Sequence, residues 1–406
     1  MKRRRLLRGG LIAVALLIVV PFVGRRAFFL PPLYFRMAYY LIQRSSVMRD
    51  QVDWPTVRTE ADALRRGART TTETYPAIRH VLSRLGDHHS HLADPETVRA
   101  HRAGASTTLG LTAIWPERIV ATVSADGPAE LAGVRPGDVV EAVNGKEPAH
   151  VETVVLFPRE PKPVEITLRR TGDATSRTVS LTARETPFNH SAQVRALPGG
   201  LGYVDVPGVV GEGGSFDRHA VAAIHLVDFG APRCGWIVDL RRNVGGNMWP
   251  MLHALRPILG EATPGYFVSS TGREEFSYRY GRGPGGSAPE YRLQKPDPPV
   301  AVLTSRLTVS SGEAITIAFR GRPATRSFGE ATAGLPTSNQ SFPLVDGAVL
   351  VVTVSREADR TGRVYDGRIT PDENVAIDWT RVGAGDDPVL LAASAWLRSQ
   401  PQCAAP

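Results

Sequence analysis

The strongest constraint on the fold is a strand, a helix and a second strand that follow one another between residues 202 and 240. Residues 202–206 and 235–240 have the composition of strands, and residues 216–229 have the spacing of an amphipathic helix. A further apolar run at 300–304 is followed by a helical pattern at 314–319. This βαβ order predicts an α/β or α+β protein. With 406 residues, 39 Gly and 32 Pro, the chain has room for two or three domains and is too rich in turn formers for a helical bundle.

Two serines stand where the run at 300–304 gives way to a helix. Residues 308–313 read Thr-Val-Ser-Ser-Gly-Glu, so Ser310 and Ser311 lie at the predicted helix start. The first N–H groups of a helix lack internal partners and can stabilise a developing negative charge, which makes Ser310 a candidate nucleophile. An N-cap is the alternative, because Ser310 and Glu313 also have the spacing of a capping box. This stretch alone leaves both interpretations open.

A glycine pair follows the strand-like run at 235–240. Residues 239–246 read Asp-Leu-Arg-Arg-Asn-Val-Gly-Gly. Because they lack side chains, Gly245 and Gly246 allow a close approach of the backbone to a ligand and can present N–H groups to an oxyanion. A tight turn explains the same pair equally well.

Three histidines lie at the end of a helical pattern that runs from residue 33 to about residue 100. They are His88, His89 and His91. On a helix His89 would not share a face with the other two, and the sequence has no second ligand cluster, so a metal site is disfavoured. A surface cluster and a general base remain open, since an imidazole titrates near neutral pH and can take a proton from a serine.

Residues 108–181 alternate strand-like runs with glycine-bearing turns, which predicts a small β-rich module. Between residues 124 and 145 the motifs Gly-Pro-Ala-Glu-Leu-Ala-Gly-Val, Arg-Pro-Gly-Asp and Val-Asn-Gly follow in an order that resembles a PDZ domain. In that family a peptide adds as an extra strand and loop amides hold its carboxylate, a role that the resemblance gives to Leu109, Gly110 and Leu111. A scaffold module with a degenerate groove is the alternative.

The first 26 residues have the features of a targeting segment. A basic start precedes an apolar run at 11–23, whose length suits a signal peptide. No small-residue cleavage site follows, which favours an uncleaved membrane anchor, and in either case the rest of the chain is exported. Seven basic residues of this segment supply most of the net charge of +8 and leave only +1 for the remainder, so nucleic-acid binding loses its main support.

Two cysteines are present in the sequence, Cys234 in a strand-like run and Cys403 near the end. A structural disulfide between them is possible, although the pattern does not require one. Neither cysteine has the histidine or acidic neighbours expected of a metal ligand.

In combination, these motifs resemble a family of serine peptidases. The chain carries, in order, a histidine-bearing helical region, a PDZ-like module, Asp-Leu-Arg-Arg-Asn-Val-Gly-Gly, Thr-Val-Ser-Ser-Gly-Glu, Gly-Glu-Ala-Thr-Ala-Gly and Gly-Arg-Ile-Thr-Pro-Asp. This order is similar to that of the tail-specific, or C-terminal processing, proteases and the tricorn core peptidase. The resemblance covers nearly everything after the N-terminal segment. It implies a multidomain α/β (α+β) fold with a ClpP/crotonase-like βαβ peptidase core.

The resemblance assigns the acylation machinery to particular residues. The family nucleophile lies three positions before the acidic residue of a Ser-x-x-Asp/Glu motif, which places it at Ser310. One oxyanion amide then falls on Ser311, and the second falls on Gly245 or Gly246 in the glycine pair.

The general base follows the pattern of one subgroup. Tail-specific members use a lysine directly after the Gly-Asp/Glu motif, where this chain has Leu335, so the Ser-Lys dyad is absent. Tricorn-like members use the histidine of a motif resembling Asp-x-His-Ser, which falls on His89. They add an acidic residue just before the late Gly-x-x-x-Pro-Asp motif, which falls on Asp366, where glutamate is more usual.

The expected domains are a signal peptide or membrane anchor at 1–26, a helical region with the histidine motif at 27–100, a PDZ-like domain at 101–185 and a serine peptidase core at 186–398. The resemblance implies a serine endopeptidase, and the N-terminal segment predicts that its catalytic part lies outside the cytoplasm, in a periplasmic or extracellular position. Its partners would be the membrane and a peptide or protein with an accessible C-terminus, and oligomerisation is possible. No metal and no organic cofactor is implied.

Two other classes of function remain open. A catalytically inactive protein on the same fold could bind a peptide or another ligand, and Leu335 and Asp366 are the departures that favour it. A membrane-tethered PDZ scaffold is the weaker alternative, because it leaves the joint presence of His89, Ser310 and the glycine pair unexplained. A likeness of fold alone does not establish activity.

Overall fold

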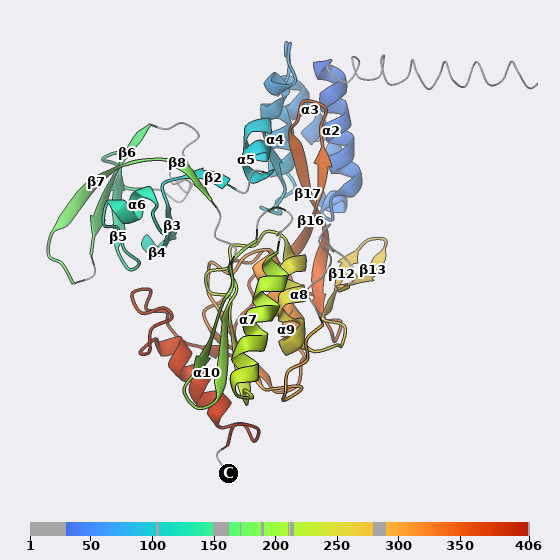
Figure 1. Cartoon of the computed structure of the whole chain (residues 1–406). Helices are drawn as coiled ribbons and strands as arrows, with labels where there is room; N and C mark the ends of the chain where they lie inside the picture. The colour runs from blue at the N-terminus through green and yellow to red at the C-terminus, as the bar shows by residue number, and fades with distance from the viewer. Residues whose placement is uncertain are drawn as a thin grey trace, which may run out of the picture. The chain divides into compact units, whose positions relative to one another are not determined.

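The computed structural model describes residues 30–102, 105–148, 162–170, 172–187, 191–209, 211, 215–278 and 290–404 (Figure 1). These residues belong to two compact units. The first unit holds residues up to Arg99 together with Ser338–Ser355, and the second holds Ala100–Thr337 with the residues from Arg356 onward. The expected targeting segment at 1–26 lies outside the described residues. Within the described ranges, no helix is both long and apolar enough to span a membrane.

The first unit is mainly helical. Its elements are α2 (Pro31–Ser45), η1 (Arg49–Gln51), α3 (Trp54–Leu64), η2 (Thr72–Thr74), α4 (Tyr75–Ser83), β1 (His91–Ala93), most of α5 (Pro95–Arg102), nearly all of β16 (Thr337–Pro343) and the first part of β17 (Val349–Asp359). Apolar side chains at helical spacing on α2 and α4, including Phe35, Ile42, Ile78 and Val81, form one core.

Residues 338–355 pack with these helices, although the sequence predicts them within the region 186–398. The physical reason is that Leu344, Leu350 and Val352 belong to the same apolar core as α2 and α4. The hydroxyls of Tyr34 and Tyr75 also donate to the two carboxylate oxygens of Asp346, at 2.9 and 2.8 Å. Strands β16 and β17, which flank this segment's turn, pair with each other.

The PDZ-like module opens the second unit. Its elements are β2 (Ala105–Thr108), β3 (Leu111–Ile114), β4 (Ile119–Val123), α6 (Pro128–Leu131), β5 (Val139–Val143), β6 (Pro163–Arg169), β7 (Ser176–Thr182) and β8 (Arg184–Pro187). Strands β3 to β7 form an antiparallel sheet in chain order, and β2 pairs with β8. Alternate side chains of β6, Val164, Ile166 and Leu168, are buried in its core, as a sheet with one covered face requires.

The remainder of the second unit is an α/β layer structure. Its elements are β9 (Gln193–Leu197), β10 (Leu201–Asp205), α7 (Phe216–Gly230), β11 (Gly235–Asp239), α8 (Met248–Leu259), β12 (Gly265–Ser269), β13 (Gly272–Glu275), β14 (Val300–Thr304), α9 (Ser311–Phe319), β15 (Thr325–Gly329), the end of β17, β18 (Glu373–Asn374) and α10 (Pro388–Arg398). The main sheet has the order β18-β15-β14-β11-β10-β9 and is parallel except for β9. The α/β prediction is therefore confirmed.

Both faces of this sheet are covered, which explains why its central strands are apolar throughout. Val204, Val238 and Val302 face the core formed with α7, α8 and α9. Their neighbours Tyr203, Ile237 and Leu303 belong to the core on α10, because successive strand residues point to opposite faces.

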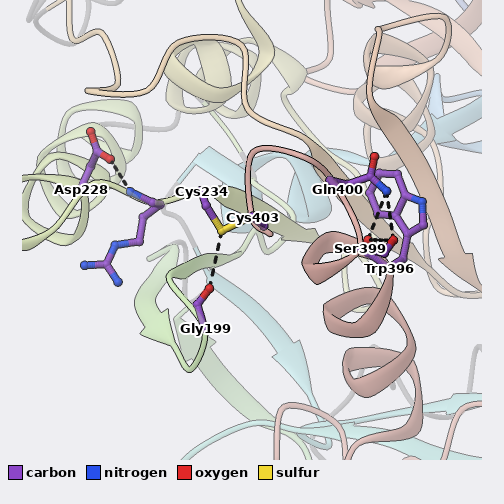
Figure 2. The surroundings of a disulfide bond; sticks show 8 residues. Gly199, Asp228, Cys234, Trp396, Ser399, Gln400 and Cys403 are labelled. Atoms are coloured by element: carbon purple, nitrogen blue, oxygen red, sulfur yellow. Dashed lines mark hydrogen bonds between the residues drawn. A yellow bond between two sulfur atoms is a disulfide. The ribbon is translucent and has the colours of Figure 1, made fainter. Parts of the chain in front are cut away.

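A disulfide joins Cys234, just before β11, to Cys403, just after α10, with a Cα–Cα distance of 5.0 Å (Figure 2). The bridge connects positions 169 residues apart in the sequence. It lies beside the α10 face of the sheet, where both cysteines contact the apolar core. The possibility that the sequence leaves open is thus realised in the structure.

Candidate active site

Three loops meet where three neighbouring parallel strands end. β11, β14 and β15 end at Asp239, Thr304 and Gly329, and the loops that follow carry residues 240–246, 305–310 and 330–335. The carboxyl ends of parallel strands lie at the same edge of a sheet, which is the usual place for a ligand in an α/β protein. The glycine pair, the serine pair and Leu335 are thereby brought to one edge.

Ser310 is the N-cap residue of α9 and has an unusual backbone conformation, with φ 55° and ψ −118°. A non-glycine residue at positive φ is strained by the order of 1–3 kcal/mol, and such strain is concentrated at functional sites. The Ser310 amide donates to Glu313 Oε2 at 3.0 Å, which is the carboxylate half of a capping box. The capping interpretation is therefore correct for Glu313, and it does not exclude a nucleophilic role for the serine.

Glu313 is fully buried and is the acceptor for several donors at once. Besides the Ser310 amide, it accepts hydrogen bonds from the amides of Gly334 and Leu335, at 2.9 and 2.7 Å, and from the hydroxyl of Thr332. Burial raises the pKa of Glu313, and the hydrogen bonds to its carboxylate oppose this shift. The carboxylate joins the serine loop to the loop that ends at Leu335.

The glycine pair has conformations that only glycine adopts easily. Gly245 and Gly246 have φ values of 90° and 109°. A Cβ atom at Gly245 would lie 3.0 Å from the Ser310 Cβ, and one at Gly246 would lie 2.0 Å from the carbonyl oxygen of Val209. The carbonyl of Gly246 accepts a hydrogen bond from the Ser311 hydroxyl. The glycine pair and the serine pair are therefore in contact.

The two glycine amides differ in their partners. The Gly245 amide donates to the side-chain oxygen of Asn243 at 3.0 Å. In contrast, the amides of Gly246 and Ser311 donate to no other residue in the part of the chain that the structure describes. Two N–H groups without partners, on loops that meet beside Ser310, are the donor set that an oxyanion hole requires. Of the two glycines, Gly246 is the one whose amide is free to serve.

Asn243 holds this arrangement together, and the sequence analysis gives it no role. Its side-chain NH₂ donates to the Val206 carbonyl at 3.0 Å, and its backbone carbonyl accepts the Val309 amide at 3.1 Å. The residue is completely buried. Its place between a buried strand and a glycine pair is the only sequence signal that could have identified it.

His89 belongs to the first unit, whereas Ser310 and Asp366 belong to the second. The histidine region is not a continuation of a helix, because α4 ends at Ser83 and a turn with positive φ at Gly86 and His88 follows. The carboxylate of Asp87 shapes this turn, since its Oδ1 accepts the amides of His89 and Ser90 at 3.0 and 2.8 Å.

The imidazole of His89 is half-buried, and burial lowers its pKa from 6.5 to about 4. The neighbouring Asp87 opposes this shift, and His91 adds to it. A histidine with this pKa is neutral at pH 7, which is the state that accepts a proton. His88 and His91 are both exposed, and the Nδ1 of His91 lies 3.1 Å from the carbonyl oxygen of His89.

Asp366 lies in the loop after β17 with 79% of its side chain exposed. Its carboxylate forms an ion pair with the Nε of Arg356 at 3.6 Å. This environment differs from that of Glu313, which is enclosed by donors.

In the PDZ-like module, Leu109 and Leu111 are buried and Gly110 has a φ of 78°. The carbonyl of Leu109 accepts the amide of Ala129, in α6, at 3.0 Å. The three predicted peptide-binding residues thus form the loop that leads into β3 and contacts α6. Across the described ranges, no group of three or more His, Cys, Asp or Glu side chains is arranged to hold a metal ion.

Comparison with known proteins adds independent information. Residues 200–375 match peptidase family S41, and residues 119–170 match the PDZ domain. The nisin-resistance protein of Lactococcus lactis subsp. lactis is 34% identical over 36% of this chain and 50% of its own length. The chloroplastic carboxyl-terminal-processing peptidase 2 of Arabidopsis thaliana is 25% identical over 75% of this chain. The chain spans 60% of that relative's length.

Among solved structures, the photosystem II D1 C-terminal processing protease superposes with a TM-score of 0.60 at 24% sequence identity. The match covers 85% of this chain and 92% of that protein. At this level of identity the similarity demonstrates a shared fold.

Proposed function

We propose that the chain is a serine endopeptidase that cleaves exported peptides or proteins, because residues 200–375 match peptidase family S41 and residues 119–170 match the PDZ domain. One observation carries the proposal. Ser310 is held at positive φ at the start of α9, and the nearby amides of Ser311 and Gly246 donate to no partner among the residues that the structure describes. A strained serine with two free N–H groups beside it suits nucleophilic attack followed by stabilisation of an oxyanion.

The proposed reaction is acyl transfer without a cofactor. Ser310 Oγ attacks the scissile carbonyl while a neutral His89 takes the serine proton and returns it to the leaving amine. The amides of Ser311 and Gly246 donate to the oxygen that becomes negative in the tetrahedral intermediate. A water molecule then gives a proton to His89 and attacks the acyl carbonyl. The bond to Ser310 Oγ breaks, and the serine regains its proton from His89. The low pKa of His89 keeps the ring unprotonated at neutral pH, but it also makes the ring a weaker base than an ordinary imidazole.

Asp366 is the proposed acidic partner of the imidazole, directly or through a hydroxyl. Its support is its position before the late Gly-x-x-x-Pro-Asp motif. Its exposed carboxylate and its ion pair with Arg356 indicate that solvent and the guanidinium weaken its field, so its contribution to the rate would be smaller than that of a buried acid.

The PDZ domain is proposed to recruit the substrate by its C-terminus. The loop at Leu109, Gly110 and Leu111 would hold the terminal carboxylate through backbone amides, and the peptide would extend along β3. The basic and apolar N-terminal segment is proposed to export the chain and to anchor it to the membrane.

The experiment that tests the activity is labelling of the full chain with a fluorophosphonate probe, which reacts only with an activated serine. We expect labelling of the wild type and its loss in Ser310→Ala and in His89→Ala. His219→Ala is the control, since His219 is an exposed histidine on α7 with no contact to the His89 turn among the described interactions. Labelling that survives in His89→Ala would remove this residue as the base.

Substrate recruitment is tested separately. A set of peptides would be offered with either a free or an amidated C-terminus, and cleavage would be followed by mass spectrometry. We expect the free acids to be cut at least ten times faster at low concentration, because amidation removes the charge that the loop amides hold. Equal rates for the two forms would contradict recruitment by the C-terminus.

A catalytically inactive binding protein is the second candidate. The presence of Leu335 in place of a lysine and the exposure of Asp366 favour it. It predicts that folded wild type binds C-terminal peptides but neither reacts with the probe nor cleaves them.

A further inference from the structure

The turn that carries His89 is built around one carboxylate. Asp87 uses its Oδ1 to accept the amides of His89 and Ser90, and its Oδ2 accepts the Ser90 hydroxyl at 2.6 Å. Both oxygens of the carboxylate are therefore engaged by the segment that follows it. The backbone on each side of the His89 Cα has its direction fixed by these contacts.

The Ser90 hydroxyl also links this turn to a buried strand. Its oxygen accepts the backbone amide of Thr353, in β17, at 2.9 Å, and it lies 3.2 Å from the Thr353 hydroxyl. Since a hydroxyl has one proton, the shorter contact to Asp87 Oδ2 is the donated bond. The connection therefore runs from the Thr353 amide to the Ser90 hydroxyl and then to the Asp87 carboxylate.

Thr353 is itself immobilised. It is completely buried, its hydroxyl donates to the Asn339 side-chain oxygen at 3.0 Å, and its carbonyl accepts the Val47 amide at 2.9 Å. A residue held at its amide, its carbonyl and its hydroxyl is a rigid point of attachment. The strand pairing of β1 with β17, in which His91 faces Val351, extends the same attachment beyond the turn.

We propose that Asp87, Ser90 and Thr353 form a lock that positions the His89 imidazole for proton transfer. Thr353 and Ser90 act as positioning residues, because their hydrogen bonds hold the turn that carries the ring. The inference rests on the proposed role of His89 as the base. Its physical basis is that an error of about 1 Å in the place of a catalytic group lowers a rate by about 100-fold.

The lock is tested in the full chain with Ser90→Ala and Thr353→Val, the latter removing only the hydroxyl of Thr353. Two quantities are measured: the rate of fluorophosphonate labelling at pH 7, and the titration of the His89 ring by NMR, assigned with His89→Ala. For Ser90→Ala we expect labelling to slow by about 10- to 100-fold and the His89 pKa to rise toward that of an ordinary histidine, as the released ring gains solvent. Thr353→Val should produce the same changes at smaller size.

Two further variants separate positioning from general destabilisation. Ser90→Thr retains a hydroxyl and should restore most of the labelling rate and the original titration. Ser83→Ala is the matched control, because the Ser83 hydroxyl donates to the His80 carbonyl in the same unit but outside the lock. It should leave both measurements unchanged.

The proposal is overturned if the His89 titration is the same in the wild type, Ser90→Ala and Thr353→Val, or if Ser90→Thr is as impaired as Ser90→Ala. Failure of the proposed function has a different signature. If His89→Ala is labelled like the wild type, His89 is not the base. The lock is then judged on the NMR titration alone, which does not depend on catalysis.

Discussion

The amide nitrogen of Ser310 lies 3.0 Å from Glu313 Oε2, and the amide nitrogen of Leu335 lies 2.7 Å from the same oxygen. One buried carboxylate oxygen thus holds both the strained serine and Leu335, at the end of the neighbouring loop. The backbone around the candidate nucleophile depends on an acceptor with no donor of its own, and this dependence can be tested.

Glu313→Gln should disrupt the site because the amide NH₂ replaces one acceptor with a donor. At least one backbone N–H would then face another N–H in a buried position. We expect the free energy of unfolding to fall by about 2–4 kcal/mol and fluorophosphonate labelling to fall at least tenfold. Urea denaturation and labelling measure the two effects. Glu274→Gln, on exposed β13, is the control and should change neither.

Gly246→Ala should be far more damaging than an alanine at another glycine of positive φ. Its Cβ would lie 2.0 Å from the Val209 carbonyl oxygen, so the glycine loop must move away from the serine loop. Gly67, at φ 82°, has no atom within 4 Å of such a Cβ, and Gly67→Ala measures the backbone strain alone. We expect about 1 kcal/mol of destabilisation for Gly67→Ala. Gly246→Ala should cost at least about 2 kcal/mol more than Gly67→Ala and should abolish labelling. Equal losses of stability in the two variants would show that the loop relieves the steric conflict.

The pH dependence of labelling should reflect the low pKa of His89. The ring acts as a base only when neutral, so the rate should be constant from pH 6 to 8 and fall by half near pH 4, where the pKa lies. An ordinary histidine would give a midpoint near 6.5. The free energy of unfolding should also decrease as the pH falls below about 6.5. The unfolded chain binds this proton more tightly than the folded chain does, so protonation stabilises the unfolded state. A labelling midpoint above pH 6 would contradict the prediction.

Arg241→Met should lower the free energy of unfolding of the second unit by more than the removal of a surface ion pair does. The Arg241 guanidinium is completely buried and lies 2.6 Å from Asp239 and 2.7 Å from Asp387. Its loss leaves two buried carboxylates without the cation that pairs with them, at a cost of about 3–5 kcal/mol. Arg381→Met, which removes exposed pairs with Asp378 and Asp386, should cost less than about 1 kcal/mol. Urea denaturation of both variants would show whether burial decides the difference.

Replacement of Cys234 and Cys403 by serine should destabilise the second unit. In the chain-entropy description, a bridge between positions 169 apart contributes at most about 5 kcal/mol. We expect a loss of about 2–5 kcal/mol in urea denaturation, and a similar loss when the wild type is reduced with dithiothreitol. The reductant should have no effect on the double variant. Any response there would indicate that it acts elsewhere.

The main sheet could be predicted from the sequence because its signals are local. The apolar strand at 300–304 and the helix that follows Ser310 are each encoded by neighbouring residues, and the structure has both as β14 and α9. The tight turn at Gly245 and Gly246 could also be predicted, because a glycine pair after a strand favours positive φ, which both residues have.

Contacts between distant segments could not be predicted in this way. Three of the donors to the Glu313 carboxylate, Thr332, Gly334 and Leu335, lie in residues 332–335, and no spacing rule connects them to a helix start. The same holds for residues 338–355. Their apolar side chains pack in the helical core of the first unit, but their sequence pattern does not indicate which core they join. The histidine turn differs from the expected helix because the Asp87 side chain competes for the backbone amides that a helix would use.

The disulfide also changes what a single break in the backbone can do. Everything from Cys234 to Cys403, including the serine pair and the glycine pair, lies within one covalently closed ring. A protease that cuts one exposed loop inside this ring opens it but releases no fragment, so both sides of the sheet edge stay attached. Such a nicked molecule would run as one species on a non-reducing gel and separate into pieces only after reduction.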